Sequence, residues 1–213
     1  MRPDEPPTTA CVRLRLFYFR HGETLWSLSG QHTGVTDIPL TVHGETQARA
    51  LRPWALELSF SHVLTSPRLR AHATCELAGL GGRAQIEPDL AEWNYGDYEG
   101  RRSVDIREQR PGWNIFRDGC PNGESPSAIG ERIDRLITRL RTMEGEIALF
   151  SHGQFGATFA ARWIGLSVFE AQHFEVGPAS MSVLSWDRDH PEIPVIALWN
   201  AAPGPNAPAV PVP

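Results

Sequence analysis

Short apolar runs alternate with amphipathic segments along most of the chain. The first run, Leu16-Phe17-Tyr18-Phe19, has no polar break, which is typical of a strand buried on both faces. Similar runs predict further strands at residues 61–65, 85–87, 146–150, 181–186 and 194–199. The segments between them predict helices at residues 41–51, 67–80, 103–109, 126–143 and 154–164, with a further turn from Pro53.

Strands that alternate with helices predict an α/β fold. We expect a three-layer α/β/α sandwich around a mainly parallel central sheet whose last strands can run antiparallel. Residues 1–11 and 203–213 are polar or rich in proline and alanine, so we expect both ends to be disordered. The predicted folded unit is a single domain over residues 12–202, because 213 residues suffice for one well-packed core and are few for two.

Three segments show neither the apolar run of a buried strand nor the spacing of an amphipathic helix, so they are predicted to be loops. They lie at residues 25–39, 90–100 and 112–124. Long loops inside a compact domain usually serve a site. Two serine-proline pairs, Ser66-Pro67 and Ser125-Pro126, predict helix N-caps with proline in the first turn.

Charge and composition narrow the classes of partner. A net charge of −5 gives no general basic field for nucleic acid or an anionic membrane, so neither partner is expected. All 20 cationic side chains are arginine, which excludes a lysine Schiff base and a lysine-dependent phosphate loop. Neither a signal peptide nor a membrane-spanning run is predicted. Cys11, Cys75 and Cys120 lack metal-like spacing and indicate reduced thiols, so we expect a cytoplasmic protein.

Reactive side chains lie at three predicted strand-to-helix junctions. Arg20-His21-Gly22 ends the first strand, Ser66 to Arg70 follows the second, and Ser151-His152-Gly153 follows the strand at 146–150. If these strands are neighbours, two imidazoles and at least two guanidinium groups converge at the carboxyl edge of the sheet. Such a set suits a phosphoryl group, because guanidinium groups bind its oxygens and a neutral imidazole can attack phosphorus.

Four motifs follow one another in a fixed order along the chain. They are Arg20-His21-Gly22-Glu23-Thr24, Ser66-Pro67-Arg68-Leu69-Arg70-Ala71 with Thr74, Leu90 and Glu92 with Gly96 and Glu99-Gly100, and Ser151-His152-Gly153. Together they resemble the histidine phosphatase superfamily, in its phosphoglycerate-mutase-like branch. Residues 29–34 and 113–124 look most like the corresponding segments of its acid phosphatase and sedoheptulose-bisphosphatase members.

The resemblance implies a role for each matching residue. His21 would be the nucleophile that becomes phosphohistidine, while Arg20 and Arg70 would clamp the phosphoryl oxygens. His152 would donate to the same oxygens, and Glu92 would protonate the leaving alcohol and then activate water. The sequence has no His-x-His or His-Glu-x-x-His pairing, so we expect no metal, and no other cofactor is expected. The expected substrate contacts are Ser27, Thr33, Gly34, Trp93, Tyr95 and Gln154. Arg68 and the other histidines, His32 among them, are expected to be surface or structural residues.

Hydrolysis is favoured over phosphoryl transfer within a substrate. The chain has no lysine, and Trp93 follows the predicted acid where glycolytic mutases of the family carry arginine. We therefore expect a phosphomonoesterase, monomeric or homodimeric, that acts on a small phosphorylated metabolite such as a sugar phosphate or bisphosphate. The alternatives are a phosphoglycerate mutase and a catalytically weak module that binds a phosphorylated ligand.

Overall fold

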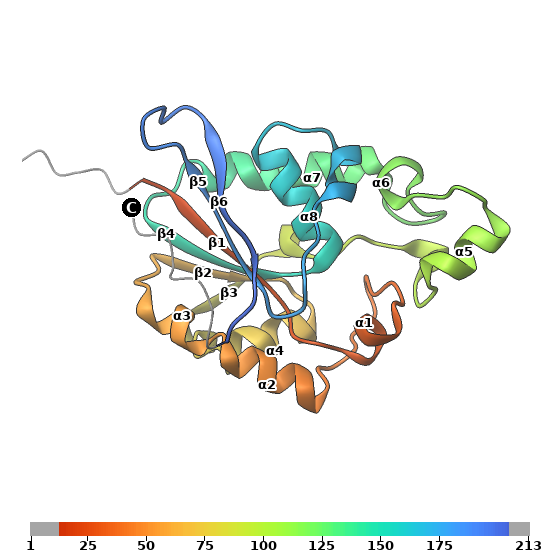
Figure 1. The fold of residues 1–213 in the computed structure, drawn as a ribbon, viewed down its shortest axis with the longest axis horizontal. Coiled ribbons are helices and arrows are strands. Elements are labelled where there is room, and N and C mark those ends of the chain that lie inside the picture. The colour runs from red at the N-terminus through yellow and green to blue at the C-terminus, as the bar shows by residue number, and fades with distance from the viewer. Residues whose placement is uncertain (1–12, 205–213) are drawn as a thin grey trace, which may run out of the picture.

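A computed structural model describes residues 13–204, which are organised around one six-stranded sheet (Figure 1). The strands are β1 (Arg15–Arg20), β2 (His62–Thr65), β3 (Ala84–Ile86), β4 (Glu146–Ser151), β5 (Met181–Trp186) and β6 (Pro194–Ala201). Their order is β3-β2-β4-β1-β5-β6, and β5 runs antiparallel to both of its neighbours while the other pairs are parallel. The α/β fold with a mainly parallel sheet is therefore confirmed.

Helices cover both faces of this sheet (Figure 1). One face carries α2 (Val42–Ala50), α3 (Arg52–Glu57) and α4 (Leu69–Leu77), and the other carries α7 (Pro126–Leu140) and α8 (Gly153–Trp163). Three further helices lie beyond the edge where β1 ends: α1 (Leu25–Ser29), α5 (Ser103–Gln109) and α6 (Ile115–Asp118). The 3-10 turns are η1 (Gly81–Arg83), η2 (Pro88–Leu90), η3 (Gly96–Tyr98) and η4 (Val168–His173).

The side chains of β1 divide between two hydrophobic clusters. Leu16 and Tyr18 pack in the cluster that contains α7 and α8, whereas Phe17 and Phe19 pack with Trp54 of α3 on the opposite face. Successive strand residues point to opposite faces, so a strand covered on both sides must be apolar throughout. This explains the unbroken apolar run and places Arg20 at the end of β1, where the covered part of the strand stops.

Two predicted loops contain short helices. Residues 25–29 form α1, because Thr24 and Ser27 make a reciprocal capping box and Gly30 ends the helix in the left-handed conformation. Residues 115–118 form α6, which begins where the Asn114 side chain accepts from the Phe116 amide. Both helices are too short to give a periodic signal in the sequence.

The two serine-proline pairs behave differently. Ser125 caps α7 as predicted, accepting from the Ala128 amide at 3.1 Å. The predicted cap at Ser66 is wrong, because α4 begins only at Leu69 and its N-cap residue makes no side-chain capping bond. The Ser66 hydroxyl accepts from the Arg68 amide at 3.2 Å, ahead of the helix, and also lies against the ring of His152.

Several predictions fall partly outside the described residues. The predicted disorder of residues 1–11, and that of all but the first two residues of 203–213, lies beyond residues 13–204, and the single-domain extent stays a prediction.

Cys75 and Cys120 are buried free thiols, and burial raises the pKa of each to about 12, whereas Cys11 is not described. Within residues 13–204, every helix is too short or too polar to cross a bilayer.

Candidate active site

Three motif segments meet because their strands are adjacent. β4 lies between β1 and β2 and is parallel to both, with Arg20 opposite Ser151 and Thr65 opposite Phe150. Residues that follow these strands therefore emerge at one edge of the sheet. The rings of His21 and His152 lie there with centroids 5.2 Å apart and planes at 64°.

The ring of His21 is held in one tautomer. Its Nδ1 lies 2.7 Å from the carbonyl oxygen of Gly22, which can only accept, so Nδ1 carries the proton and Nε2 keeps its lone pair. Burial, together with the charges of Arg70 and Arg20, lowers the pKa of His21 well below its ordinary 6.5. The imidazole is therefore neutral near pH 7 and offers Nε2 as a nucleophile.

Glycine is required where the chain leaves β1. A Cβ at Gly22 would lie 2.3 Å from the carbonyl oxygen of Gly44 in α2, a distance that no side chain tolerates. The Gly22 amide donates to the Thr74 hydroxyl of α4 at 3.1 Å. These contacts with two helices fix the carbonyl group that orients His21.

His152 is the N-cap residue of α8 and is fully buried. Its Nε2 lies 2.7 Å from the Ser66 hydroxyl, and its backbone exchanges hydrogen bonds with the Tyr18 hydroxyl. Burial is also the main cause that lowers the pKa of this imidazole, followed by the charge of Arg70. Its Nδ1 is buried without a protein partner among the described residues, so this atom is available to a ligand.

Two guanidinium groups flank the imidazoles, that of Arg70 fully buried and that of Arg20 partly buried. Arg20 donates to the carbonyl of Val176, and Arg70 donates to the carbonyls of Thr33, Gly34 and Thr36 at 2.8 to 3.2 Å. The Nε atoms of both arginines are buried without a partner within residues 13–204. Since unmade hydrogen bonds of buried donors are costly, these groups suit an anionic ligand that supplies acceptors.

Residues 33–36 form the loop whose carbonyls accept from Arg70, and Glu99 binds the same loop. Glu99 accepts from the amides of Gly34 and Thr36 at 2.9 to 3.1 Å, while the carbonyls of the same loop accept from Arg70. A Cβ at Gly34 would lie 2.4 Å from the Trp93 carbonyl oxygen, so the loop packs too closely for any other residue. Glu99 thus fixes the loop whose carbonyls orient the Arg70 guanidinium.

The carboxyl group of Glu92 lies at the N-terminus of α8. It accepts from the amides of Trp93, Gln154 and Phe155 at 2.8 to 3.1 Å. Burial raises the pKa of Glu92 above its ordinary 4.5, although these amides and the charge of Arg70 act in the opposite direction. A carboxyl group with a raised pKa is protonated over a wider pH range and can serve as a general acid.

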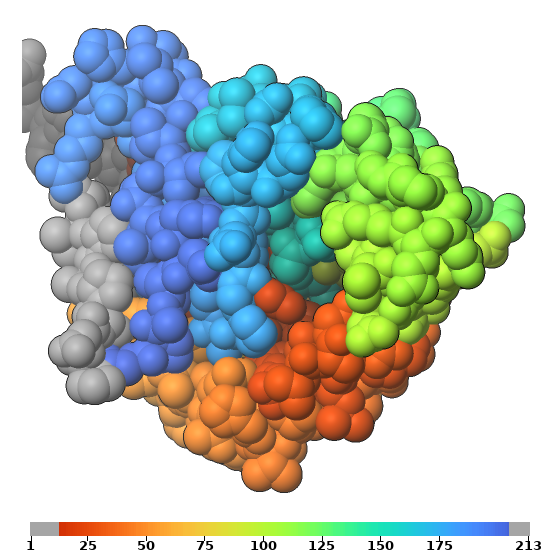
Figure 2. Space-filling view, turned by 45° about the vertical axis from the view of Figure 1, so that its right-hand side comes forward, coloured from red at the N-terminus to blue at the C-terminus, as the bar shows by residue number. Residues whose placement is uncertain are grey.

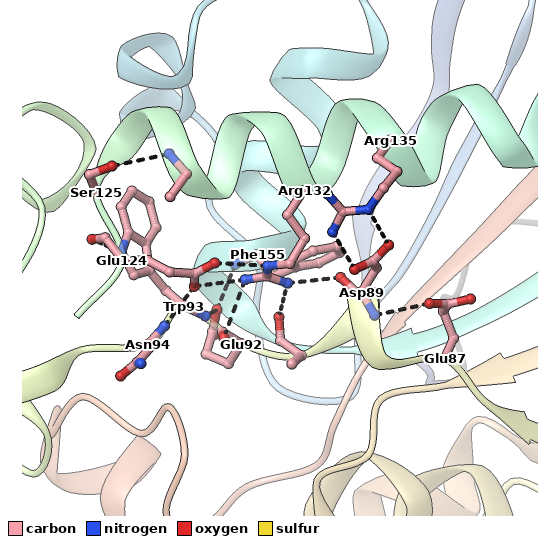
Figure 3. A network of polar contacts seen from close by, with 12 residues as sticks. Glu87, Asp89, Glu92, Trp93, Asn94, Glu124, Ser125, Arg132, Arg135 and Phe155 are labelled. Carbon is pink, nitrogen blue, oxygen red and sulfur yellow. Dashed lines mark hydrogen bonds and ion pairs between the residues drawn. The ribbon is translucent and has the colours of Figure 1, made fainter.

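A hydrogen-bond network holds the segment that carries Glu92 (Figure 3). Arg132 of α7 donates to the carbonyls of Asp89 and Ala91 at 2.8 Å and pairs with both carboxylate oxygens of Glu124. Glu124 in turn accepts from the Asn94 amide, so residues 89–94 are tied to α7 at both ends of the segment. Little freedom remains for the Glu92 backbone.

A cavity of about 500 Å³ opens beside these residues. Figure 2 shows the surface hollowed between the green segment around α5 and α6 and the lighter blue segment around η4, with the red segment below. Arg20, His21 and Glu92 line the cavity, whereas Arg70 and His152 are fully buried and do not line it. Of the six expected substrate contacts, four line the cavity: Ser27, Thr33, Tyr95 and Gln154.

Gly34 and Trp93 do not line the cavity, and their expected substrate contacts stay predictions. Gly34 belongs to the loop between Glu99 and Arg70, and Trp93 is fully buried with its indole N–H donating to the Glu124 carbonyl at 3.0 Å. The Ser27 hydroxyl accepts from the Thr24 amide and donates to the Thr24 carbonyl, so its proton is used within the α1 cap.

Several lining residues were not found from the sequence. His32, expected to be structural, stacks on Tyr95 with ring centroids 4.5 Å apart, and both line the cavity. Phe116 of α6 also lines it, as does most of the segment 171–177, which comprises the end of η4 and the residues after it, and so does Asn200 at the end of the sheet. Residues 171–177 lie about 150 positions after His21 and carry no motif, so only the fold brings them to the site.

Arg68 lies outside the cavity lining and donates to the Val35 carbonyl at 3.1 Å, in line with its expected place near the surface. No group of three histidine, cysteine or carboxylate side chains among residues 13–204 is arranged to hold a metal ion. The donor set around His21 consists instead of guanidinium and imidazole N–H groups, with a carboxyl group beside them.

A neutral imidazole between guanidinium groups, with a protonatable carboxyl group nearby, defines a site for phosphoryl groups in an α/β enzyme. The profile of the histidine phosphatase superfamily (branch 1) matches residues 16–200, so the chain belongs to that family. Like the relatives it matches, the protein is a phosphatase.

The chain is similar to two curated relatives. It is 38% identical over 188 residues to an acid phosphatase of Mycobacterium tuberculosis, covering 86% of this chain and 92% of the relative. It is 37% identical over 217 residues to sedoheptulose 1,7-bisphosphatase of Saccharomyces cerevisiae, covering 86% of this chain and 78% of the relative. The chain is also similar to the solved structure of the protein from an open reading frame of Mycobacterium tuberculosis. The two superpose with a TM-score of 0.83 at 36% identity, over 89% of this chain and 98% of the solved one.

Proposed function

We propose that the protein hydrolyses a small sugar phosphate or bisphosphate through a phosphohistidine on His21. The observation that carries this proposal is the 2.7 Å contact between Nδ1 of His21 and the Gly22 carbonyl oxygen, because it leaves Nε2 unprotonated beside the guanidinium groups of Arg20 and Arg70. The relatives named acid phosphatase and sedoheptulose 1,7-bisphosphatase support the same reaction class.

In the first step, the Nε2 lone pair of His21 attacks phosphorus and the bond to the ester oxygen breaks. Arg20, Arg70 and the Nδ1–H of His152 stabilise the charge that develops on the phosphoryl oxygens. A neutral imidazole carries one N–H proton, so a proton on Nδ1 of His152 requires its Nε2 to accept. The Ser66 hydroxyl must therefore donate to Nε2 of His152. The leaving oxygen takes the proton of the Glu92 carboxyl group, so the alcohol departs uncharged.

In the second step, water attacks the phosphohistidine. The Glu92 carboxylate accepts a proton from that water, the P–N bond breaks, and the electron pair returns to Nε2 of His21. Inorganic phosphate leaves, with His21 again neutral and Glu92 again protonated. The cycle needs no metal ion.

Within the cell, we propose a cytoplasmic location, which the buried reduced state of Cys75 and Cys120 supports. A monomer or a homodimer is equally compatible with the proposed reaction.

Phosphate release from a panel of phosphorylated metabolites, with and without a chelator, tests this function. We expect hydrolysis of sugar phosphates that the chelator leaves unchanged. Interconversion of 2- and 3-phosphoglycerate faster than phosphate release would instead establish a mutase. No release from any ester would favour a binding module.

A further inference from the structure

The cavity provides almost no positive charge for the part of a substrate beyond the reacting phosphoryl group. Among its lining residues within 13–204, Arg20 alone carries a permanent positive charge, and it lies next to His21 at the phosphoryl site. The second guanidinium group, that of Arg70, is buried behind the wall and is bound to three loop carbonyls.

The imidazoles do not supply the missing charge. The His32 ring stacks on Tyr95 and its Nε2 lies 3.1 Å from the Ser103 hydroxyl, and burial lowers its pKa to about 4, so it is neutral at physiological pH. His21 and His152 are kept neutral by burial and by the two arginines. A leaving group therefore meets aromatic faces, hydroxyls and amides.

Negative charge is present instead. Glu175 lies in the segment after η4, is solvent-exposed and lines the cavity, which places it at the open side. Its neighbours along the wall, Phe174 and Gln172, are uncharged. A second phosphate or carboxylate on the substrate would lie in a cavity whose one lining cation within residues 13–204, Arg20, is already placed at the phosphoryl site, so the negative charge of Glu175 would repel it.

We propose that the cavity selects substrates with one phosphoryl group and no second anionic group, and that Glu175 excludes a second phosphate or carboxylate. This inference rests on the proposed phosphomonoesterase function and narrows its substrate class to monophosphate esters of uncharged alcohols, such as polyols and sugars. The stacked pair of His32 and Tyr95 and the ring of Phe116 offer apolar faces for such a leaving group.

The test compares esters with and without a second anionic group: glycerol 3-phosphate with 3-phosphoglycerate, glycerol 2-phosphate with 2-phosphoglycerate, and fructose 6-phosphate with fructose 1,6-bisphosphate. We expect higher kcat/KM for the first member of each pair. In Glu175→Gln the preference should narrow about threefold, and in Glu175→Arg about tenfold, since an exposed charge acts through solvent. Added salt should narrow the wild-type preference as well.

Glu170→Gln is the matched control, because Glu170 lies on η4 close in sequence but outside the cavity lining. Its preference should equal that of the wild type. Wild-type preference for the doubly anionic esters, or an unchanged preference in both Glu175 variants, would overturn the inference while leaving the phosphatase function intact. Absence of hydrolysis of every ester would overturn the proposed function itself.

Discussion

The variant His21→Ala is expected to lose phosphatase activity by about 10⁴-fold or more in kcat, because removal of a nucleophile abolishes the covalent route. Neither of the other groups at the site can replace it: His152 is fully buried against Ser66, and Glu92 is bound by three backbone amides. Steady-state phosphate release from a sugar phosphate measures the loss.

His43→Ala provides the control for this variant. His43 is an exposed histidine of α2 whose ring contacts Gln47 and which does not line the cavity. Its activity should match that of the wild type. Thermal unfolding of both variants shows whether the fold is retained, and a folded His21→Ala enzyme that keeps more than about a hundredth of wild-type kcat would exclude His21 as the nucleophile.

Glu92→Gln is expected to lower kcat/KM for alkyl phosphates by about 10²- to 10⁴-fold, the usual contribution of a general acid. The size of the loss should depend on the leaving group, because p-nitrophenolate departs without a proton and an alkoxide does not. We therefore expect a much smaller loss with p-nitrophenyl phosphate than with glycerol 3-phosphate. Equal losses for both esters would contradict the role of Glu92 as the proton donor.

The pH profile separates this role from a structural one. Protonation of His21 blocks attack, and its pKa is lowered, so the acidic limb of kcat/KM lies below pH 6.5. Deprotonation of Glu92 removes the acid, and its pKa is raised, so the limb it causes lies above pH 4.5. In Glu92→Gln the limb due to Glu92 should disappear and the limb due to His21 should remain. A variant that is merely misfolded would lose rate without losing a limb.

The sequence was sufficient for features that depend on local patterns. The unbroken apolar run of β1 requires a strand covered on both faces, and its abrupt end at Arg20 marks the carboxyl edge of the sheet. The Ser125 cap and the apolar face of α7 follow from spacing alone. Four ordered motifs then indicated the family, which the matching profile shows.

Features that depend on long-range packing were not predictable in this way. Ser66 has the local signature of an N-cap, yet its hydroxyl is bound to His152, 86 positions away. Trp93 follows Glu92 directly, but its indole is directed into the core toward Glu124. The wall formed by residues 171–177 has no motif, and its position depends on how η4 packs on α6 and α8.

The positioning of Arg70 depends on a similar long-range contact. Glu99 belongs to the same motif as Glu92, and no spacing rule distinguishes an acid that meets the substrate from one that fixes a loop. The structure separates them, because Glu92 lines the cavity while Glu99 accepts from the amides of Gly34 and Thr36. Two glutamates seven positions apart, Glu92 and Glu99, thus have different roles.

Trapping the phosphoenzyme tests the central claim most directly. The enzyme is mixed with a sugar monophosphate, quenched within one turnover at alkaline pH, where phosphohistidine survives, and digested for mass spectrometry. The account predicts one phosphoryl group on the peptide that contains His21, and none in His21→Ala. A phosphoryl group on another residue, or rapid turnover with no labelled peptide at any quench time, would contradict it.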